Sequence, residues 1–249
     1  MWKMLFYKSW LESRSRFVWC LSLTLASISH GVLTAPTVIR SVRQQLPWVE
    51  VSFPSYLWID LYAGSLLAAW IALVVMLAMG GLRWEEASGT CLFTLALPIR
   101  RSKLLLGQLG VAVAESMAFG FLPALLIPGL SSLVNQTYPL GQALRHSLLL
   151  VGAGEVLYGW AFLVSQMIQK QFGALAISLS SIGAFFVLVK RVRALDHFDI
   201  FDIMTGADLL NRKTFMLHGP LPWVSLATIT SLFMAMVLLS ILLIERHDF

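Results

Sequence analysis

The sequence predicts an all-α polytopic membrane protein, a single transmembrane domain over residues 1–249 that is built from six membrane-spanning helices. Hydrophobic residues make up 58% of the chain, charged residues make up only 12%, and the mean hydropathy is +0.78. A soluble domain carries about 25% charged residues, so half that share leaves little charge to solvate a surface. Six apolar stretches each hold the roughly 20 residues that a helix needs to cross a hydrocarbon core of about 30 Å.

The six predicted spans cover residues 17–39, 57–82, 104–130, 147–168, 173–190 and 223–244. The fifth is the shortest, and the first is the most polar. Ahead of the first, residues 2–11 (WKMLFYKSWL) predict a separate interfacial helix, with its aromatic side chains toward lipid and its lysines near the headgroups. No small-residue cleavage site follows a short apolar core there, so we expect the first span to stay in the protein.

The basic residues near the first spans predict the orientation of the chain. Arg14 and Arg16 precede the first span, and Arg100, Arg101 and Lys103 lie at the start of the third. Basic clusters at the foot of a span mark the cytoplasmic side of a membrane. Six spans put both termini on one side, so we expect an integral protein of the cell (inner) membrane with both termini in the cytoplasm.

The segment between the second and third spans, RWEEASGTCLFTLALPIRRSKLLLG (83–107), is too charged to cross a membrane. Acidic residues favour the N-terminus of a helix, and Glu85 and Glu86 stand near its beginning. Pro98 makes helix continuation past Leu97 unfavourable. The segment therefore predicts a short amphipathic helix over 84–97 that lies on the inner membrane surface and contacts a cytoplasmic partner.

Two acidic residues fall inside predicted spans, Glu115 in the third and Glu155 in the fourth. An ionisable side chain at the centre of a bilayer costs at least about 2.5–3.5 kcal/mol, so such residues face the bundle interior, pair, or line water. We expect both near mid-depth, sharing a proton or bonded to Tyr158 or to polar residues of the first span such as Ser29 and His30. Two interpretations have equal weight, a polar lining of a substrate path and a satisfied interhelical hydrogen bond.

The outer segment 191–222 contains four residues of metal-ligating type, Asp196, His197, Asp199 and Asp202. Oxygen and imidazole ligands in close register are compatible with a metal site. The favoured alternative is a short amphipathic helix, with Phe198, Ile200, Phe201 and Ile203 in lipid and the acidic residues in water. We therefore predict no metal site.

Several catalytic signatures are absent from the sequence. It holds no Gly-Lys dipeptide and therefore no P-loop for nucleotide phosphates, and no HExxH, GxSxG or CxxC motif. Glu85-Glu86 partly matches the EExxxR motif of intramembrane CAAX-type proteases, but Thr90 stands at the Arg position. No basic patch interleaves with aromatic residues, so we expect no nucleic acid partner. The chain is predicted not to be an enzyme and to hold no cofactor of its own.

Three short motifs resemble those of ABC type-2 permeases, in the same order around the spans. The first is Glu12-Ser-Arg-Ser-Arg16, and the last is Glu245-Arg-His-Asp-Phe249, with His247 where an Arg is more usual. The middle motif is Glu86-x-x-Gly89-Thr90, followed by Leu97-Pro98-x-Arg100-Arg101 and Gly107.

The resemblance implies the permease subunit of an ATP-driven exporter, with 84–97 as a coupling helix and 2–16 as a second contact. Its partners would be an ABC-type ATPase subunit that binds ATP and Mg²⁺, a second permease subunit that is identical or paralogous, and membrane lipid. The ATPase-coupling residues implied are Glu85, Glu86, Gly89, Thr90, Arg100 and Arg101. Two alternatives stay open, an ion-coupled secondary transporter and an accessory membrane-assembly subunit without its own substrate path.

Overall fold

Six long helices form the bundle in the computed structural model, which describes residues 2–48, 50–79, 100–168, 170–192 and 199–246. Each of the six is long and apolar enough to cross a membrane. They are α1 (Trp2–Gln45), the run Phe53–Ala78, α6 (Arg101–Leu133), α7 (Leu140–Met167), α8 (Gln171–Arg191) and α10 (Trp223–Arg246). The predicted all-helical class is thereby confirmed, and so is the prediction of six helices able to span a membrane.

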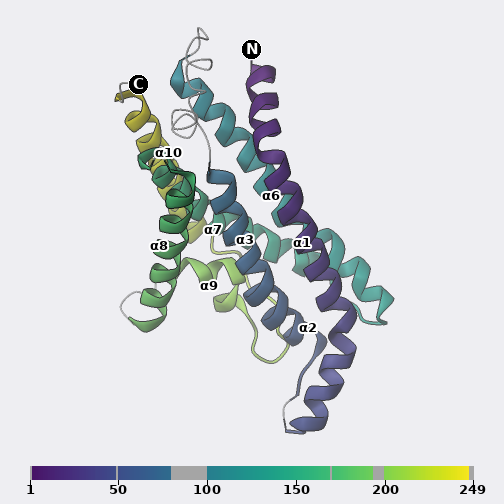
Figure 1. Ribbon diagram of the computed structural model, residues 1–249. Helices are drawn as coiled ribbons and strands as arrows, with labels where there is room; N and C mark the ends of the chain where they lie inside the picture. Colours follow the sequence, from purple (N-terminus) through teal and green to yellow (C-terminus); the bar gives the residue numbers. More distant parts are fainter. Residues whose placement is uncertain (1, 49, 80–99, 169, 193–198, 247–249) are drawn as a thin grey trace.

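Both ends of the described chain lie at the same end of the bundle, where α3 ends and α6 begins (Figure 1). We call this the terminal end. The predicted helix over 84–97 lies outside the described residues, as does every residue between 80 and 99. The described residues that border this segment, Met79 and Arg100, both belong to the terminal end.

The first helix differs from the prediction. Instead of an interfacial helix followed by a span, α1 is one uninterrupted helix of 44 residues from Trp2 to Gln45. No Gly or Pro separates the two predicted pieces, so nothing in 11–17 breaks the helical hydrogen bonds. At about 1.5 Å per residue the helix is about 66 Å long, roughly twice the hydrocarbon thickness, so it extends well beyond the membrane core.

The second span is composite. It consists of α2 (Phe53–Tyr56), a π-helical stretch η1 (Leu57–Ser65) and α3 (Leu66–Ala78). Ser52 and Ser55 form a capping box that starts it, each side chain bonded to the backbone N–H of the other. Longer π-helical stretches are rare and widen the helix locally, which re-aims the side chains that follow.

Helix α7 is the centre of the bundle. The most apolar part of it is 78% buried, and α10, α6, α3, α8 and α9 all pack against it. Trp70 of α3 is fully buried where α3, α6 and α7 meet, between Gly120 and Gly154. A Cβ atom at either glycine would overlap the indole ring. These two glycines therefore provide the space that lets three helices close around one tryptophan.

Candidate functional site

The predicted coupling residues are only partly described. Glu85, Glu86, Gly89 and Thr90 lie outside the described residues, and the prediction that they contact an ATPase is not tested by the fold. Arg100 is exposed and directly precedes α6, while Arg101 is its first residue.

Glu115 bonds to the first helix. Its Oε1 accepts a hydrogen bond of 2.6 Å from the hydroxyl of Ser13, and both side chains are buried between α6 and α1. The same helices touch closer to the terminal end, where a Cβ at Gly107 would lie 3.3 Å from that of Leu5. This close approach of α1 and α6 brings Ser13 within reach of Glu115.

Glu155 of α7 bonds to Ser116, the residue that follows Glu115 on α6. The hydroxyl of Ser116 donates to Oε1 of Glu155 over 2.5 Å, which joins α6 to α7. Glu115 and Ser116 thus face two different helices, so α6 connects α1 to α7 through two consecutive side chains. The expected interhelical hydrogen bonds are present, but the partners are Ser13 and Ser116.

Three buried oxygen atoms close to these two hydrogen bonds have no partner among the residues that the structure describes. They are Oε2 of Glu115, Oε2 of Glu155 and the hydroxyl of Tyr158. Tyr158 is fully buried and interacts electrostatically with Glu155, Glu115 and Arg16. We call Ser13, Arg16, Glu115, Ser116, Glu155 and Tyr158 the carboxylate cluster. Each of its two acids thus has one carboxyl oxygen that is bonded to a serine hydroxyl and one that is buried without a hydrogen-bond partner among the described residues.

Arg16 connects this cluster to the end of α3. Its Nη1 donates to the backbone carbonyl oxygens of Met76 at 2.7 Å and Met79 at 2.5 Å, and its Nη2 donates to the carbonyl oxygen of Glu12 at 3.1 Å. The last carbonyl groups of a helix lack partners within it, and a cation there also complements the helix dipole. Arg16 therefore holds the last described turn before residue 80.

The polar residues predicted from the first span do not join the cluster. His30 is exposed and Ser29 is half-buried. Ser29 lies sixteen residues beyond Ser13 on α1, about 24 Å along the helix axis. The prediction that Ser29 or His30 bonds Glu115 or Glu155 is wrong, because the contact of α1 with α6 at this depth uses residues that precede the predicted span.

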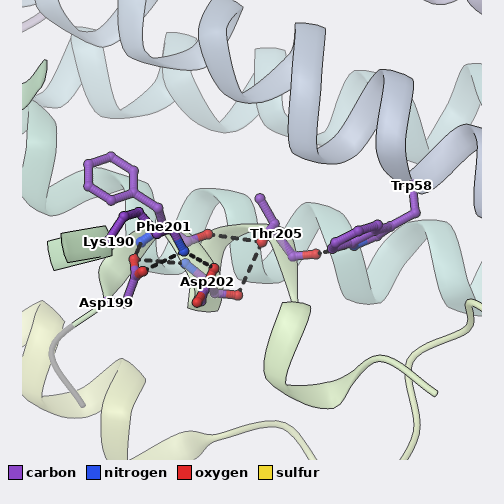
Figure 2. Close-up of polar contacts among 6 residues, drawn as sticks. All are labelled: Trp58, Lys190, Asp199, Phe201, Asp202 and Thr205. Carbon is purple, nitrogen blue, oxygen red and sulfur yellow. Dashed lines mark hydrogen bonds and ion pairs between the residues drawn. The ribbon is translucent and has the colours of Figure 1, made fainter. Parts of the chain in front are cut away.

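A different set of acids fixes the segment after α8, at the other end of the bundle. Figure 2 shows Lys190 of α8 beside Asp199 and Asp202, with N···O distances of 2.6 Å to each. Asp199 caps α9 (Ile200–Thr205) by accepting from the backbone N–H groups of Phe201 and Asp202. Trp58 of η1 donates from Nε1 to the carbonyl oxygen of Thr205 over 3.0 Å. We call these contacts the α9 clasp.

The α9 clasp revises the prediction for this segment. Phe201 is buried against Phe185 and Phe186 of α8 instead of dipping into lipid. Burial raises the pKa of the Asp202 carboxyl, and the Lys190 ammonium opposes that shift. Among the described residues no group of three His, Cys, Asp or Glu side chains is arranged to hold a metal, while Asp196, His197 and Phe198 lie outside them.

Comparison with protein-family models, with curated proteins and with solved structures finds no match for this chain. Function is therefore inferred from the residues and their geometry.

Proposed function

We propose that this chain is the transmembrane permease subunit of an ATP-driven exporter of the ABC type-2 class. In this proposal it forms the substrate path and couples to a separate ATP-binding subunit, which holds ATP and Mg²⁺. A second permease subunit, identical or paralogous, completes the path. The proposal places the chain in the inner membrane with the terminal end in the cytoplasm.

One observation carries the proposal: the first family-like motif contacts both helices that border residues 80–99. Arg16 bonds to the end of α3, and Ser13 bonds to Glu115 on α6. Gly107, from the middle motif, packs against Leu5 of α1. A helix over 84–97 that moves with an ATPase would thus act on α3 and α6 together, and both of these helices contact α1.

The proposal gives the carboxylate cluster a role in coupling, because Arg16 binds the last described turn before residue 80. Movement of α3 changes the carbonyl groups that Arg16 binds, and Arg16 interacts electrostatically with Glu115. Ser116 passes any shift of α6 on to Glu155 on the central helix α7. Closure of an ATPase beneath residues 80–99 would in this way reach the middle of the bundle through a short chain of contacts.

The test is purification of the tagged chain from its own cells in mild detergent, with mass spectrometry of the co-purifying proteins and an assay of ATP hydrolysis. We expect a P-loop ATPase in the eluate. Glu86→Lys and Gly89→Leu should weaken its retention or uncouple hydrolysis from transport, while the chain still inserts. Matched controls are Asp208→Lys and Gly141→Leu; Asp208 is exposed at the other end, and a Cβ at Gly141 meets nothing within 4 Å. Normal ATPase retention and transport in both test variants would refute the coupling assignment.

A second candidate function, an ion-coupled secondary transporter, is favoured by the unpartnered oxygen atoms of Glu115 and Glu155. Substrate flux into reconstituted vesicles, measured with an imposed pH gradient and no ATPase, distinguishes the secondary transporter from the ABC permease. Proton-driven flux that Glu115→Gln or Glu155→Gln abolishes supports the transporter, and flux only with ATP and the partner supports the permease.

A further inference from the structure

A groove on the side of the bundle lies between α7, α8 and α10 and has a volume of about 270 Å³. Both α8 and α10 pack on α7, and they form the two walls with α7 as the floor. These walls are among the least buried helices of the bundle, with 22% and 28% of their most apolar parts buried. Ile200 of α9 also lines it.

The groove lies at the depth of the hydrocarbon core. Its wall and floor residues lie between 7 residues (Trp160 to Met167) and 14 residues (Leu232 to Arg246) from the terminal end of their own helices. At about 1.5 Å per residue, this places the groove about 10–21 Å from that end, near the middle of a core of about 30 Å. In a spanning bundle the surrounding medium at this depth is lipid.

The side chains of the lining offer a ligand no free hydrogen-bond donor. Its two polar groups are bonded already, since Nε1 of Trp160 donates to the hydroxyl of Ser181 over 2.8 Å and that hydroxyl donates to the carbonyl oxygen of Ser178 over 2.9 Å. The other lining residues are aliphatic, aromatic or Met. A ligand in this groove therefore makes only apolar contacts, held by many small dispersion contributions.

The size of the groove selects among apolar occupants. A helix with its side chains is about 10–12 Å across, so a helix from a second copy of the chain does not fit into about 270 Å³. A single hydrocarbon chain is much thinner than a helix with its side chains, so the groove accommodates part of one such chain.

We propose that this groove is a binding site for one acyl chain of a membrane phospholipid, held against Trp160 by α8 and α10. The site does not depend on export or on an ATPase partner. Association inside a bilayer exchanges one apolar contact for another. Retention of the lipid therefore depends on how well the groove fits a single acyl chain.

Native mass spectrometry of the full chain, released from mild detergent, measures the retained phospholipid. Leu232→Trp adds bulk to the groove, and Leu239→Trp is its matched control two turns along the same helix, outside the lining; the two leucines are 46% and 47% exposed. We expect one lipid per wild-type chain, unchanged in Leu239→Trp and reduced about tenfold in Leu232→Trp, which corresponds to about 1.4 kcal/mol. Equal retention in both variants overturns the proposal.

Fluorescence locates the lipid independently of Leu232. The wild-type chain is loaded with phosphatidylcholine brominated at mid-chain, excess lipid is removed in detergent, and tryptophan emission is compared with that of Trp160→Phe. We expect quenching in the wild type that is largely lost in Trp160→Phe, because Trp160 is the one tryptophan in the groove lining among the residues that the structure describes. Equal quenching in both proteins overturns the site. A wild-type chain that retains no lipid, but whose dimer Leu232→Trp dissociates, assigns the groove to a second copy instead.

Discussion

The carboxylate cluster and the α9 clasp hold their acidic side chains in different ways. In the clasp, Asp199 and Asp202 share the ammonium of Lys190, whose side chain is 40% exposed. In the cluster, Glu115 and Glu155 lie between helices and accept hydrogen bonds from serine hydroxyls. An ion pair near solvent keeps part of its hydration, whereas a charge within the hydrocarbon depth loses it. Asp199 is buried too, so the two regions differ in the direct partner of the acid: a lysine ammonium in the clasp, and serine hydroxyls in the cluster, where Arg16 acts on Glu115 only electrostatically.

Helix α7 carries parts of the cluster and also packs against α9, so a change at its centre disturbs both regions at once. Gly154→Val should have the largest effect, because even the first side-chain atom overlaps the indole of Trp70. Overpacking of a core costs about 1–3 kcal/mol and occasionally more, and we expect the upper end here. Thermal unfolding in detergent measures it, with Gly129→Val as the control, since a Cβ there meets nothing within 4 Å. Equal loss in both variants would contradict the tight fit.

Loss of Arg16 separates the cluster from the end of α3 and leaves the clasp intact. Arg16→Met removes charged hydrogen bonds to the carbonyl oxygens of Met76 and Met79, and hydrogen bonds to charged groups contribute about 1.5–3 kcal/mol. We expect a loss of about 2–3 kcal/mol in unfolding stability. Arg14→Met, two residues away at an exposed position, should change it little. Similar melting temperatures for the two variants would show that Arg16 does not hold α3.

Asp199→Ala weakens the clasp alone. It removes the cap that accepts from two backbone N–H groups of α9, and loss of such a cap costs about 0.5–2 kcal/mol. Hydrogen exchange of the Phe201 and Asp202 amides should accelerate, while amides near Glu115 stay protected. Asp208→Ala, at an exposed acid after α9, is the control. Unchanged protection in Asp199→Ala would mean that aromatic packing, not the cap, orders α9.

The smallest effect concerns Glu155 of the cluster. We expect Glu155→Gln to be more stable than Glu155→Leu by about 1 kcal/mol, because an amide still accepts from Ser116. The difference is small since the Ser116 hydroxyl has a second acceptor, the carbonyl oxygen of Val113 at 2.9 Å. Thermal unfolding measures stability, and transport is assayed in parallel. Loss of transport in Glu155→Gln, with expression intact, would show that titration of this acid matters beyond its hydrogen bond.

The helices were predictable because about 20 consecutive apolar residues leave few alternatives to a membrane span. Apolar length does not reveal that a span is composite. Nothing in the run LWIDLYAGS (57–65) indicates a π-helical stretch, and the prediction treated it as part of one regular span. The continuous first helix was missed because residues 2–11 were assigned to a separate interfacial helix, although the charged residues at 12–16 are compatible with one continuous helix.

The partners inside the cluster were less predictable than its acids. Glu115 and Glu155 stand out as charges in apolar runs, but the sequence gives no register between helices. The partners of these acids were sought inside the first span, whereas Ser13 precedes it. The motif Glu12-Ser-Arg-Ser-Arg16 was the available signal, and it was interpreted as a surface contact. In the same way, Phe201 has the pattern of a lipid-facing residue, and only the position of α8 shows that it is buried.

The unbroken first helix gives the protein a stiff rod that passes through the whole membrane. Its single internal proline, Pro36, lies near the far end, so the stretch from Trp2 to Ala35 contains no residue that removes a helical hydrogen bond. That stretch is about 50 Å long. If it pivots at one end, a tilt of about 5° displaces the other end by about 4 Å, a distance comparable to the rise of nearly one helical turn. A small rotation at the Trp2 end is thereby converted into a side-chain-sized movement on the opposite side of the membrane.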